Sequence, residues 1–247
     1  MRILLSGLNG HMGKEVVALA RQGCRGANIV AGVDFLNTSG NIPCAGSFEY
    51  AEADVDCVID FSHHSCTGKL LEYAIKNRLP LVIATTGQTE EEKKMISDAS
   101  DVIPIFYAAN FSIGIALLIE MAKKAASVLP EAEIEIVEVH HDRKLDAPSG
   151  TALAIANALQ TVRADATFKA GRNGAGKREK NEIGISSVRM GNIVGIHEVM
   201  ICTSTQTITL KHEAHSRALF AEGALAAADF ICGKTAGLYG MSDMIKI

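Results

Sequence analysis

The sequence predicts an α/β protein whose first half is a doubly wound parallel β-sheet with helices on both faces. Short apolar runs rich in β-branched residues alternate along this half with segments that can form helices, which is the pattern of parallel strands joined by crossover helices. The runs at 57–60 and 81–84 are largely apolar, as expected for strands covered on both faces. After Asn110 the pattern changes, and the length of 247 residues also favours two domains.

The composition excludes several classes of function. Hydrophobic residues make up 48% of the chain and charged residues 21%, which is typical of a soluble globular protein. The 24 lysines and arginines are outnumbered by 28 acidic residues, so the chain lacks a broad basic surface for nucleic acid or anionic lipid. We therefore expect neither nucleic acid nor a membrane as a partner, and any anion has to bind at a local site.

The N-terminus and the cysteines bear on the cellular compartment. Residues 1–10 contain too few apolar residues before their glycines for a signal peptide or a membrane span, so we expect a cytoplasmic protein. The cysteines form no C-x-x-C pair, and Cys57 and Cys202 lie in apolar, strand-like runs. Buried free thiols are therefore expected rather than disulfides.

The first half contains the predicted parallel strands. They lie in the runs 2–7, 28–34, 55–61, 81–87 and 102–110. Most of the segments between them can form helices. One helix start is well marked, because Thr89 is followed by three glutamates at 90–92, which together give an N-cap, a capping box and an acidic first turn.

The second half has a different order of elements. We expect a long helix at 112–129, a strand at 133–141, a helix at 150–160, strands at 183–190, 195–204 and 206–212, and a final helix at 216–233. The Gly- and Lys/Arg-rich segment 168–182 is expected to be a long exposed loop. Both faces of the strand at 195–204 are apolar, so we expect one face to contact helices and the other a second subunit.

A glycine-rich segment follows the first predicted strand. Gly7, Gly10 and Gly13 are spaced G-x-x-G-x-x-G, one residue away from the dinucleotide-binding fingerprint. Glycine allows the backbone to approach a pyrophosphate, whose charge then lies at a helix N-terminus, and Asn9 tolerates left-handed geometry. Asp34 ends the next strand about 20 residues later, where an acid binds the ribose hydroxyls. These features favour a nicotinamide-dinucleotide site over a purely structural glycine turn.

The residues after the second strand bear on the choice of cofactor. An acid at position 34 disfavours a 2′-phosphate, and Phe35 beside it supplies no positive charge. The sequence therefore favours NADH over NADPH, although a lysine or arginine from a distant loop could still reach the phosphate.

The segment 137–156 gathers groups that exchange protons or bind anions. If the strand continues through His140 and His141, their side chains point to opposite faces and have different roles. The Pro-Ser-Gly corner at 148–150 begins a helix whose free N–H groups form an anion pocket, and Lys144 adds a positive charge beside it. These groups predict an acid–base site within 140–151, and the alternative is a solvated strand end followed by a capped helix.

A second histidine pair, His63 and His64, lies close to Cys66. No second cluster at a recognisable spacing completes a tetrahedral zinc site, so no metal is expected. The pair follows a parallel strand, where a cofactor would bind. Two interpretations remain open: His63 contacts the ribose or phosphates of a dinucleotide, or the segment is a solvated loop.

The segment 135–156, EIVEVHHDRKLDAPSGTALAIA, resembles the signature of the 4-hydroxy-tetrahydrodipicolinate reductase family of lysine biosynthesis. The resemblance extends over nearly the whole chain, through GLNGHMG, VIDFS, ATTG, YAANFSIG, NIVGIHEV and the C-terminal HEAHSRALFAEGALAAADFICGKTAGLYGM. It implies a Rossmann-like dinucleotide-binding domain at 1–110, completed by a C-terminal helix at 215–247. It also implies an inserted α+β domain at 111–214, with a mixed and mostly open-faced sheet, that binds substrate and forms a homotetramer.

The resemblance further implies a reaction and its residues. The reaction is reduction of 4-hydroxy-tetrahydrodipicolinate, a small cyclic dicarboxylate, to tetrahydrodipicolinate with NADH or NADPH. His140 would be a proton donor and acceptor and Lys144 a proton donor, whereas His141, Ser149, Gly150 and Thr151 would bind the substrate. The cofactor would contact Gly7, Leu8, Asn9, Gly10, His11 and Met12 at its pyrophosphate, Asp34 at its ribose, and Ala84, Thr85, Thr86, Ala108, Ala109, Asn110 and Phe111 at its nicotinamide.

The chain departs from the family pattern at several positions. Ala84 replaces a usual glycine, Ile196 replaces a common acid, and the segment 168–182 lacks a usual Pro-Gly-Thr. Phe35 stands where members that use both cofactors have arginine, which again favours NADH. Two other classes remain as alternatives, namely an amino-acid dehydrogenase and a sensor that binds NADH without turnover.

Overall fold

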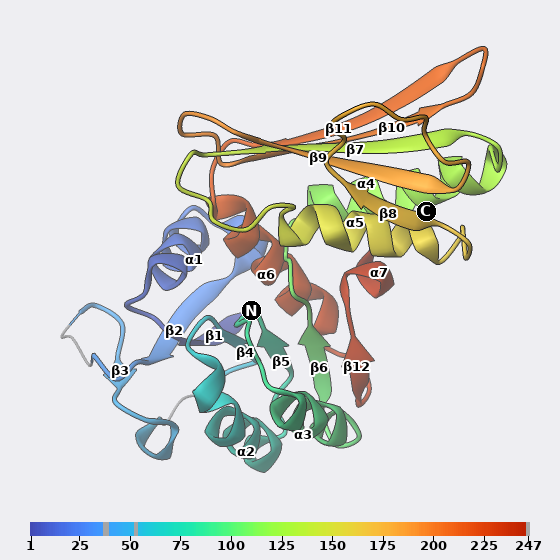
Figure 1. Cartoon of the computed structure of the whole chain (residues 1–247). Helices are drawn as coiled ribbons and strands as arrows, with labels where there is room; N and C mark the ends of the chain where they lie inside the picture. Colours follow the sequence, from blue (N-terminus) through green and yellow to red (C-terminus); the bar gives the residue numbers. More distant parts are fainter. Residues whose placement is uncertain (37–39, 52–53, 246–247) are drawn as a thin grey trace. The chain divides into compact units, whose positions relative to one another are not determined.

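The structure is a computed structural model that describes residues 1–36, 40–51 and 54–245 (Figure 1). These residues divide into two compact units. The terminal unit consists of Met1–Ser112 and residues 218–245, and the inserted unit consists of Ile113–Arg217. Each unit has its own sheet and its own hydrophobic core.

The terminal unit contains a parallel sheet that has seven strands within the described residues, in the order β12-β6-β5-β4-β1-β2-β3. The strands are β1 (Arg2–Ser6), β2 (Asn28–Val33), β3 (Cys44–Ala45), β4 (Cys57–Asp60), β5 (Leu81–Ile83), β6 (Pro104–Tyr107) and β12 (Gly237–Tyr239). The direction of the crossovers reverses between β1 and β4, which are adjacent. The predicted doubly wound parallel sheet is therefore confirmed, and its switch point lies at the carboxyl ends of these two strands.

Helices cover both faces of this sheet. They are α1 (His11–Arg21), α2 (Thr67–Asn77), α3 (Glu90–Ser100), α6 (Ala218–Ile231), α7 (Met241–Met244) and the short 3₁₀ helices η1 (Cys24–Gly26), η2 (Phe48–Tyr50) and η3 (His64–Cys66). Strand alternation sends Ile3 and Leu5 of β1 into one core with α1 and α6, and Leu4 into another core with α2 and α3. The predicted capping box at Thr89 is present, because its side chain accepts the N–H of Glu92 while Glu92 accepts the N–H of Thr89.

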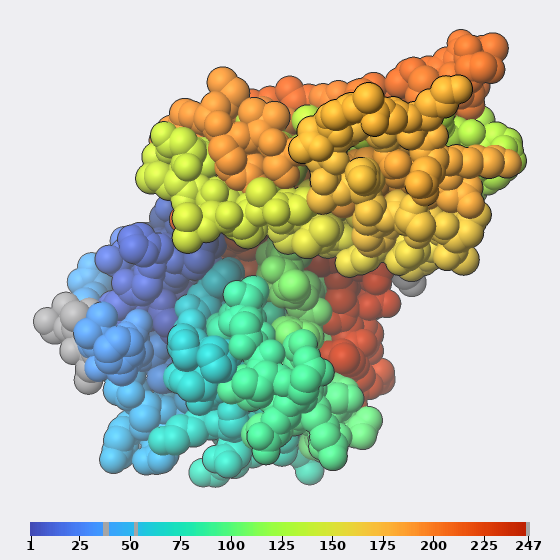
Figure 2. Space-filling model, in the orientation of Figure 1, coloured from blue at the N-terminus to red at the C-terminus, as the bar shows by residue number. Residues whose placement is uncertain are grey.

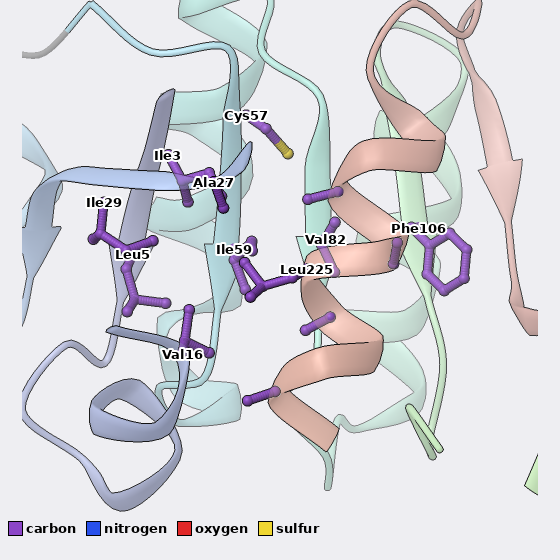
Figure 3. Packing of buried hydrophobic residues seen from close by; sticks show 14 of the residues in the cluster. Ile3, Leu5, Val16, Ala27, Ile29, Cys57, Ile59, Val82, Phe106 and Leu225 are labelled. Carbon is purple, nitrogen blue, oxygen red and sulfur yellow. The ribbon is translucent and has the colours of Figure 1, made fainter. Parts of the chain in front are cut away.

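Helix α6 packs on the sheet and against the segment that follows β6. Leu225 points from α6 toward Ile59 of β4 in the core (Figure 3). A Cβ at Gly223 would overlap the carbonyl oxygen of Phe111, in the segment after β6, so only glycine allows this contact. The alanines of α6 at 221, 224, 227 and 228 are fully buried. The small residues of this helix therefore pack closely on an existing sheet, as their abundance predicts.

The inserted unit contains a mixed sheet, with five strands within the described residues, in the order β11-β10-β7-β9-β8. The strands are β7 (Glu133–His140), β8 (Thr167–Ala170), β9 (Glu182–Arg189), β10 (Gly195–Cys202) and β11 (Thr207–Ala214). Strand β7 runs parallel to β9 and antiparallel to β10. The predicted second, mixed sheet is therefore confirmed.

Two helices, α4 (Ile113–Val128) and α5 (Gly150–Gln160), cover one face of the mixed sheet. Ile134, Ile136, Val199 and Ile201 point into the core on this face, whereas Met200 alternates to the other face and is half-buried. In the described part of the chain no helix is both long and apolar enough to span a membrane.

Two expectations about the chain course are wrong. The segment 168–182 is not a loop throughout, because β8 pairs with the start of β9; β8 is an edge strand of four residues, all exposed, which is too short for a clear pattern in the sequence (Figure 2). The chain after 215 is not one helix, because α6 ends at Ile231 and Gly233 adopts φ +85°. Strand β12 then pairs with β6 at the edge of the parallel sheet.

The cysteines follow their prediction in part. All six are free thiols, as expected. Full burial, however, holds only for Cys57. Cys202 is half-buried because alternation along β10 points it away from the two helices.

Candidate active site

The glycine turn between β1 and α1 has no room for side chains at two of its glycines. Gly7 adopts φ +79°, and a Cβ there would lie 2.5 Å from the carbonyl oxygen of Phe61. A Cβ at Gly13 would overlap the carbonyl oxygen of Gly7. Helix α1 begins after Gly10 with no side-chain cap. The turn therefore presents backbone N–H groups at a helix start, which is the arrangement that binds anions.

Asp34 lies directly beside this turn. Its Oδ2 accepts the N–H of Asn9 at 2.9 Å, and its Oδ1 accepts the N–H of Leu36 at 3.0 Å. A cavity of about 400 Å³ is lined by Gly7, Asn9, Gly10, Asp34, Phe35 and His63, among other residues. The structure thus brings the predicted pyrophosphate and ribose residues together at the switch point of the sheet.

The carboxyl end of β4 carries an acid that the sequence pattern did not single out. Asp60 is buried, and its Oδ2 accepts the hydroxyl of Thr85 at 2.6 Å while its Oδ1 accepts the hydroxyl of Ser62 at 2.6 Å. Gln88 also donates to the carbonyl of Thr85 at 2.9 Å. The Thr85 hydroxyl therefore fixes the loop after β5 to the end of β4.

The other predicted cofactor residues differ in accessibility. Leu8 and Phe111 are buried in the core, so their side chains do not face solvent. His11, Thr86 and Ala109 are exposed, whereas Met12, Ala84, Ala108 and Asn110 are half-buried. Asn110 accepts the N–H of Ser112 at 2.8 Å through its side-chain oxygen. Only part of this set can therefore offer a side chain to a ligand.

The first histidine pair is held by local contacts. His63 Nδ1 lies 2.9 Å from the Ser65 hydroxyl, and His64 Nδ1 lies 3.0 Å from Glu92. His63 also lines the cavity beside Asp34. Within residues 1–36, 40–51 and 54–245, no three His, Cys, Asp or Glu side chains are grouped so that they could hold a metal ion.

The second histidine pair lies at the end of β7, where a buried ion pair forms. Alternation places Glu138 and His140 on the helix-covered face, after Ile134 and Ile136. Glu138 is 0% exposed, and its Oε2 lies 2.6 Å from His140 Nδ1. Arg189 of β9 donates to both carboxylate oxygens of Glu138, at 2.8 and 2.7 Å. A charged cluster thus continues the apolar face of the strand.

His141 and Lys144 lie just beyond this strand. Strand β7 ends at His140, so His141 is the first residue outside it, and its N–H donates to the carbonyl of Ile193 at 2.8 Å. Its Nδ1 is buried without a partner among the described residues. Lys144 Nζ lies 2.9 Å from Asp146 Oδ1 and is largely buried. The two histidines therefore have different surroundings, although the strand does not continue through both.

The start of α5 is tied to the same cluster. Ser149 is the N-cap, and its hydroxyl accepts the N–H of Ala152 and lies 3.1 Å from His197 Nε2. The N–H of Ser149 donates to Glu138 Oε1 at 3.1 Å. Gly150 is exposed, and Thr151 is half-buried. The helix start predicted from the Pro-Ser-Gly corner thus lies beside His140 and its carboxylate.

Burial and charge set the protonation states of this cluster. Burial alone would raise the pKa of Glu138, but hydrogen bonds from Arg189, Ser187, His140 and the Ser149 backbone lower that pKa to about 2. Burial lowers the pKa of His140 despite the adjacent carboxylate, and lowers the pKa of His197 to about 4. At neutral pH the cluster therefore holds an ionised Glu138–Arg189 pair and neutral imidazoles.

Sequence reasoning missed Glu138, Arg189 and His197. A signal for Glu138 was present, because a residue two positions before His140 in a strand lies on the same face. Arg189 is opposite His140, and His197 is opposite Glu138, only through the register of β9 and β10. No spacing within one sequence reports that register.

The fold and the two sets of residues define a class, that of the two-domain oxidoreductases that use a nicotinamide dinucleotide. Residues 1–111 match the family described as dihydrodipicolinate reductase, N-terminus, and residues 114–245 match dihydrodipicolinate reductase, C-terminus. The chain belongs to this family of pyridine-nucleotide-dependent reductases. The resemblance seen in the sequence is therefore confirmed.

Similar proteins cover the whole chain. Two named 4-hydroxy-tetrahydrodipicolinate reductase, from Clostridium novyi and Caldanaerobacter subterraneus, are 43% and 45% identical to this chain and match 99% and 100% of it, in each case over 98% of their own length. A solved structure, dipicolinate-bound dihydrodipicolinate reductase from Paenisporosarcina sp. TG-14, has a TM-score of 0.84 at 26% identity and covers 99% of both chains. A probable dehydrogenase from Thermotoga maritima, at 10% identity and a TM-score of 0.66, shares the fold alone.

Proposed function

We propose that this protein reduces 4-hydroxy-tetrahydrodipicolinate to tetrahydrodipicolinate with NADH or NADPH, a step of diaminopimelate and lysine biosynthesis. The observation that carries the proposal is the full-length similarity to enzymes of this name. The acid–base cluster at the end of β7 provides the chemistry. A related structure holds dipicolinate, a cyclic dicarboxylate, and the inserted unit offers the kind of groups that bind such an anion.

The terminal unit fits a nicotinamide dinucleotide. Since Gly7 and Gly13 leave no room for a Cβ, the backbone of residues 7–12 can approach a pyrophosphate, and the uncapped start of α1 would face its charge. The carboxylate of Asp34 would accept the ribose hydroxyls. When bound, the cofactor supplies the hydride.

The nicotinamide would lie along the carboxyl ends of β5 and β6. The segments there are 84–86 and 108–111, and both follow strands of the parallel sheet. Because the Thr85 hydroxyl already donates to Asp60, we expect the backbone of its segment to contact the ring. Phe111 is buried in the core, so its contribution would also come from the backbone.

NADH would be the preferred cofactor. A 2′-phosphate beside the Asp34 carboxylate would be repelled, and Phe35, at 85% exposure, offers an aromatic surface and no charge. The cavity lining does include Lys69, but its ammonium lies 3.9 Å from Glu49. If NADPH were used, Lys69 or His63 would have to bind its 2′-phosphate.

The inserted unit would bind the substrate and exchange protons with it. The N–H groups at the start of α5, from Gly150 and Thr151, together with His141, would bind the carboxylates. Lys144 would donate the proton that accompanies the hydride, since its Nζ is held 2.9 Å from Asp146 just beyond the end of β7. His140, neutral in its cluster, can accept a proton and return it.

The proposed assembly is a homotetramer formed through the open face of the mixed sheet. On this face Val188, Val139 and Ile196 are adjacent across β9, β7 and β10, and Met190 is 55% exposed. Apolar residues of this kind, in a row on a sheet face, are typical of subunit contacts. Sedimentation at micromolar concentration is expected to give a tetramer, and a monomer alone would contradict this assembly.

The test of the function is a steady-state assay with the freshly condensed product of aspartate semialdehyde and pyruvate. Loss of nicotinamide absorbance is expected with both cofactors, at a higher kcat/KM for NADH. The same assay with an amino acid and NAD⁺ tests the dehydrogenase alternative. Binding of NADH without turnover of the condensed product would favour a sensor and contradict the proposed function.

A further inference from the structure

The most buried charge in the inserted unit is the carboxylate of Glu138. It accepts bonds from His140 Nδ1 at 2.6 Å, from both Nη atoms of Arg189, and from the N–H of Ser149 at 3.1 Å. Its neighbours on the same strand face are Ile134 and Ile136. Because burying an ion pair costs desolvation that an apolar residue avoids, a carboxylate here calls for a role besides stability.

We infer that Glu138 is a positioning residue that holds His140 in the tautomer with the proton on Nδ1, so that Nε2 is the atom that exchanges protons with the substrate. This inference rests on the proposed function, since it concerns the same reaction. Neither Glu138 nor its partner Arg189 is among the residues assigned to substrate, and Glu138 contacts one of those residues, Ser149, only through its backbone N–H, so both act through His140 and the start of α5.

The tautomer follows from the chemistry of the two partners. An ionised carboxylate only accepts hydrogen bonds, so the nitrogen 2.6 Å from it has to carry a proton. A neutral imidazole then has its lone pair on Nε2. Gly195 of β10 lies next to this atom, and a Cβ at that position would be 3.1 Å from it. A side chain at Gly195 would therefore crowd the nitrogen that would exchange the proton.

Arg189 controls the charge that His140 experiences. An unpaired carboxylate at 2.6 Å would favour the imidazolium form of His140. Because the guanidinium of Arg189 donates to both carboxylate oxygens, the Glu138–Arg189 pair has no net charge. The other groups that face His140 are Lys144 after β7, His197 of β10, and Ser149 at the start of α5 through the shared carboxylate. The cation of Lys144 also disfavours the imidazolium.

Glu138 also links proton exchange to substrate binding. Its Oε2 contacts the His140 ring, and its Oε1 accepts the N–H of Ser149, which caps the helix whose start would bind the carboxylates. One carboxylate thereby sets the distance between the imidazole and the proposed anion site. A shorter side chain would have to move one of the two.

The experiment compares Glu138→Gln with the wild-type protein by kinetics and by nitrogen NMR of the imidazoles. The amide is isosteric, but its NH₂ group donates to Nδ1 when its oxygen accepts from Arg189, which moves the ring proton to Nε2. We expect kcat to fall about 10²-fold, with KM and the NADH dissociation constant within about twofold, because positioned proton exchange is worth about 10²- to 10⁴-fold. The matched control is Glu135→Gln, on the same strand, whose partner is Arg178; its kcat should be unchanged.

The NMR measurement reads the tautomer directly and does not depend on turnover. The His140 signal is assigned by its loss in His140→Gln, and in the wild-type protein it should report protonated Nδ1. Protonated Nε2 in the wild-type protein would overturn the inference even if Glu138→Gln fails to fold. A folded Glu138→Gln with normal kcat would overturn it as well. If the wild-type protein shows no turnover but has the Nδ1–H tautomer, the proposed function fails and the positioning of His140 stands.

Discussion

The pair His63–His64 follows strand β4 and the pair His140–His141 lies at the end of strand β7, yet their surroundings differ. His64 contacts Glu92, which belongs to the capping box of α3, and His63 contacts the hydroxyl of the nearby Ser65. His140 contacts a fully buried carboxylate that Arg189 also holds. A pair of histidines in a sequence is therefore not informative by itself.

The difference lies in what fixes each ring. Partly exposed ion pairs contribute little, about 0–1 kcal/mol, and leave the imidazole free to exchange partners with water. The pair at the end of β7 instead lies among groups from three strands and the start of α5, which restrict one ring nitrogen to one partner. Restriction of this kind is what proton exchange with a substrate requires.

The largest expected effect comes from Lys144→Ala. We expect turnover to fall about 10²- to 10⁴-fold, because the proton that accompanies the hydride would lose its donor. The NADH dissociation constant should stay nearly unchanged, since Lys144 is not among the residues proposed to hold the dinucleotide. Steady-state kinetics and NADH titration check both. The exposed Lys169→Ala is the control, and near-normal turnover of Lys144→Ala would exclude Lys144 as the donor.

Matched asparagine variants compare the two pairs directly. His140→Asn should lower kcat about 10²-fold, because the neutral imidazole of the cluster is lost. His63→Asn should instead raise KM for NADH about threefold and keep kcat, because His63 lines the cavity beside Asp34. Equal losses of kcat in the two variants would show that the pairs do not differ in role.

Acid should weaken the cluster at the end of β7. The pKa of His197 in the folded protein, about 4, lies below its ordinary value of 6.5, so the unfolded chain binds more protons between these values. The contribution of His197 to the free energy of unfolding is therefore constant above pH 6.5. It falls as the pH decreases toward 4, by on the order of 2 kcal/mol.

Urea unfolding at both ends of this pH window measures the effect. His197→Gln should lose less stability on acidification than the wild-type protein, because glutamine does not titrate. The exposed His215→Gln should lose as much as the wild-type protein. An identical acid response in all three proteins would rule out His197 as the source.

The smallest effect is expected for His64→Gln. Its contact with Glu92 is partly exposed, so stability should change by about 0.5 kcal/mol or less. The values of kcat and KM should match those of the wild-type protein. A thermal denaturation scan beside the kinetic assay checks this, and a loss of turnover would give the first pair a role that its contacts do not explain.

Local signals predicted most of the fold. The glycine turn, the capping box at Thr89 and the small residues of α6 each act through neighbours in the sequence or through one packed face. The segment of β8 was missed because it is a short, exposed edge strand, and its formation depends on pairing with β9.

The site was predictable only where its residues are close in sequence. His140, Lys144 and the start of α5 lie in one segment, so their grouping could be recognised. Strand alternation alone could predict that Glu138 lies on the same face as His140, two residues later. Arg189 and His197 reach the cluster through cross-strand register, which depends on the packing of the whole sheet.

The place of α6 in the terminal unit has a consequence for the order of events during synthesis. Leu225 and the buried alanines of α6 complete a core to which β1 and β4 contribute residues made far earlier. Until the ribosome has released this helix, one face of the parallel sheet is covered only in part, by α1, whereas every residue of Ile113–Arg217 is already available to its own core. The part of the chain that is made first is therefore the part that finishes folding last.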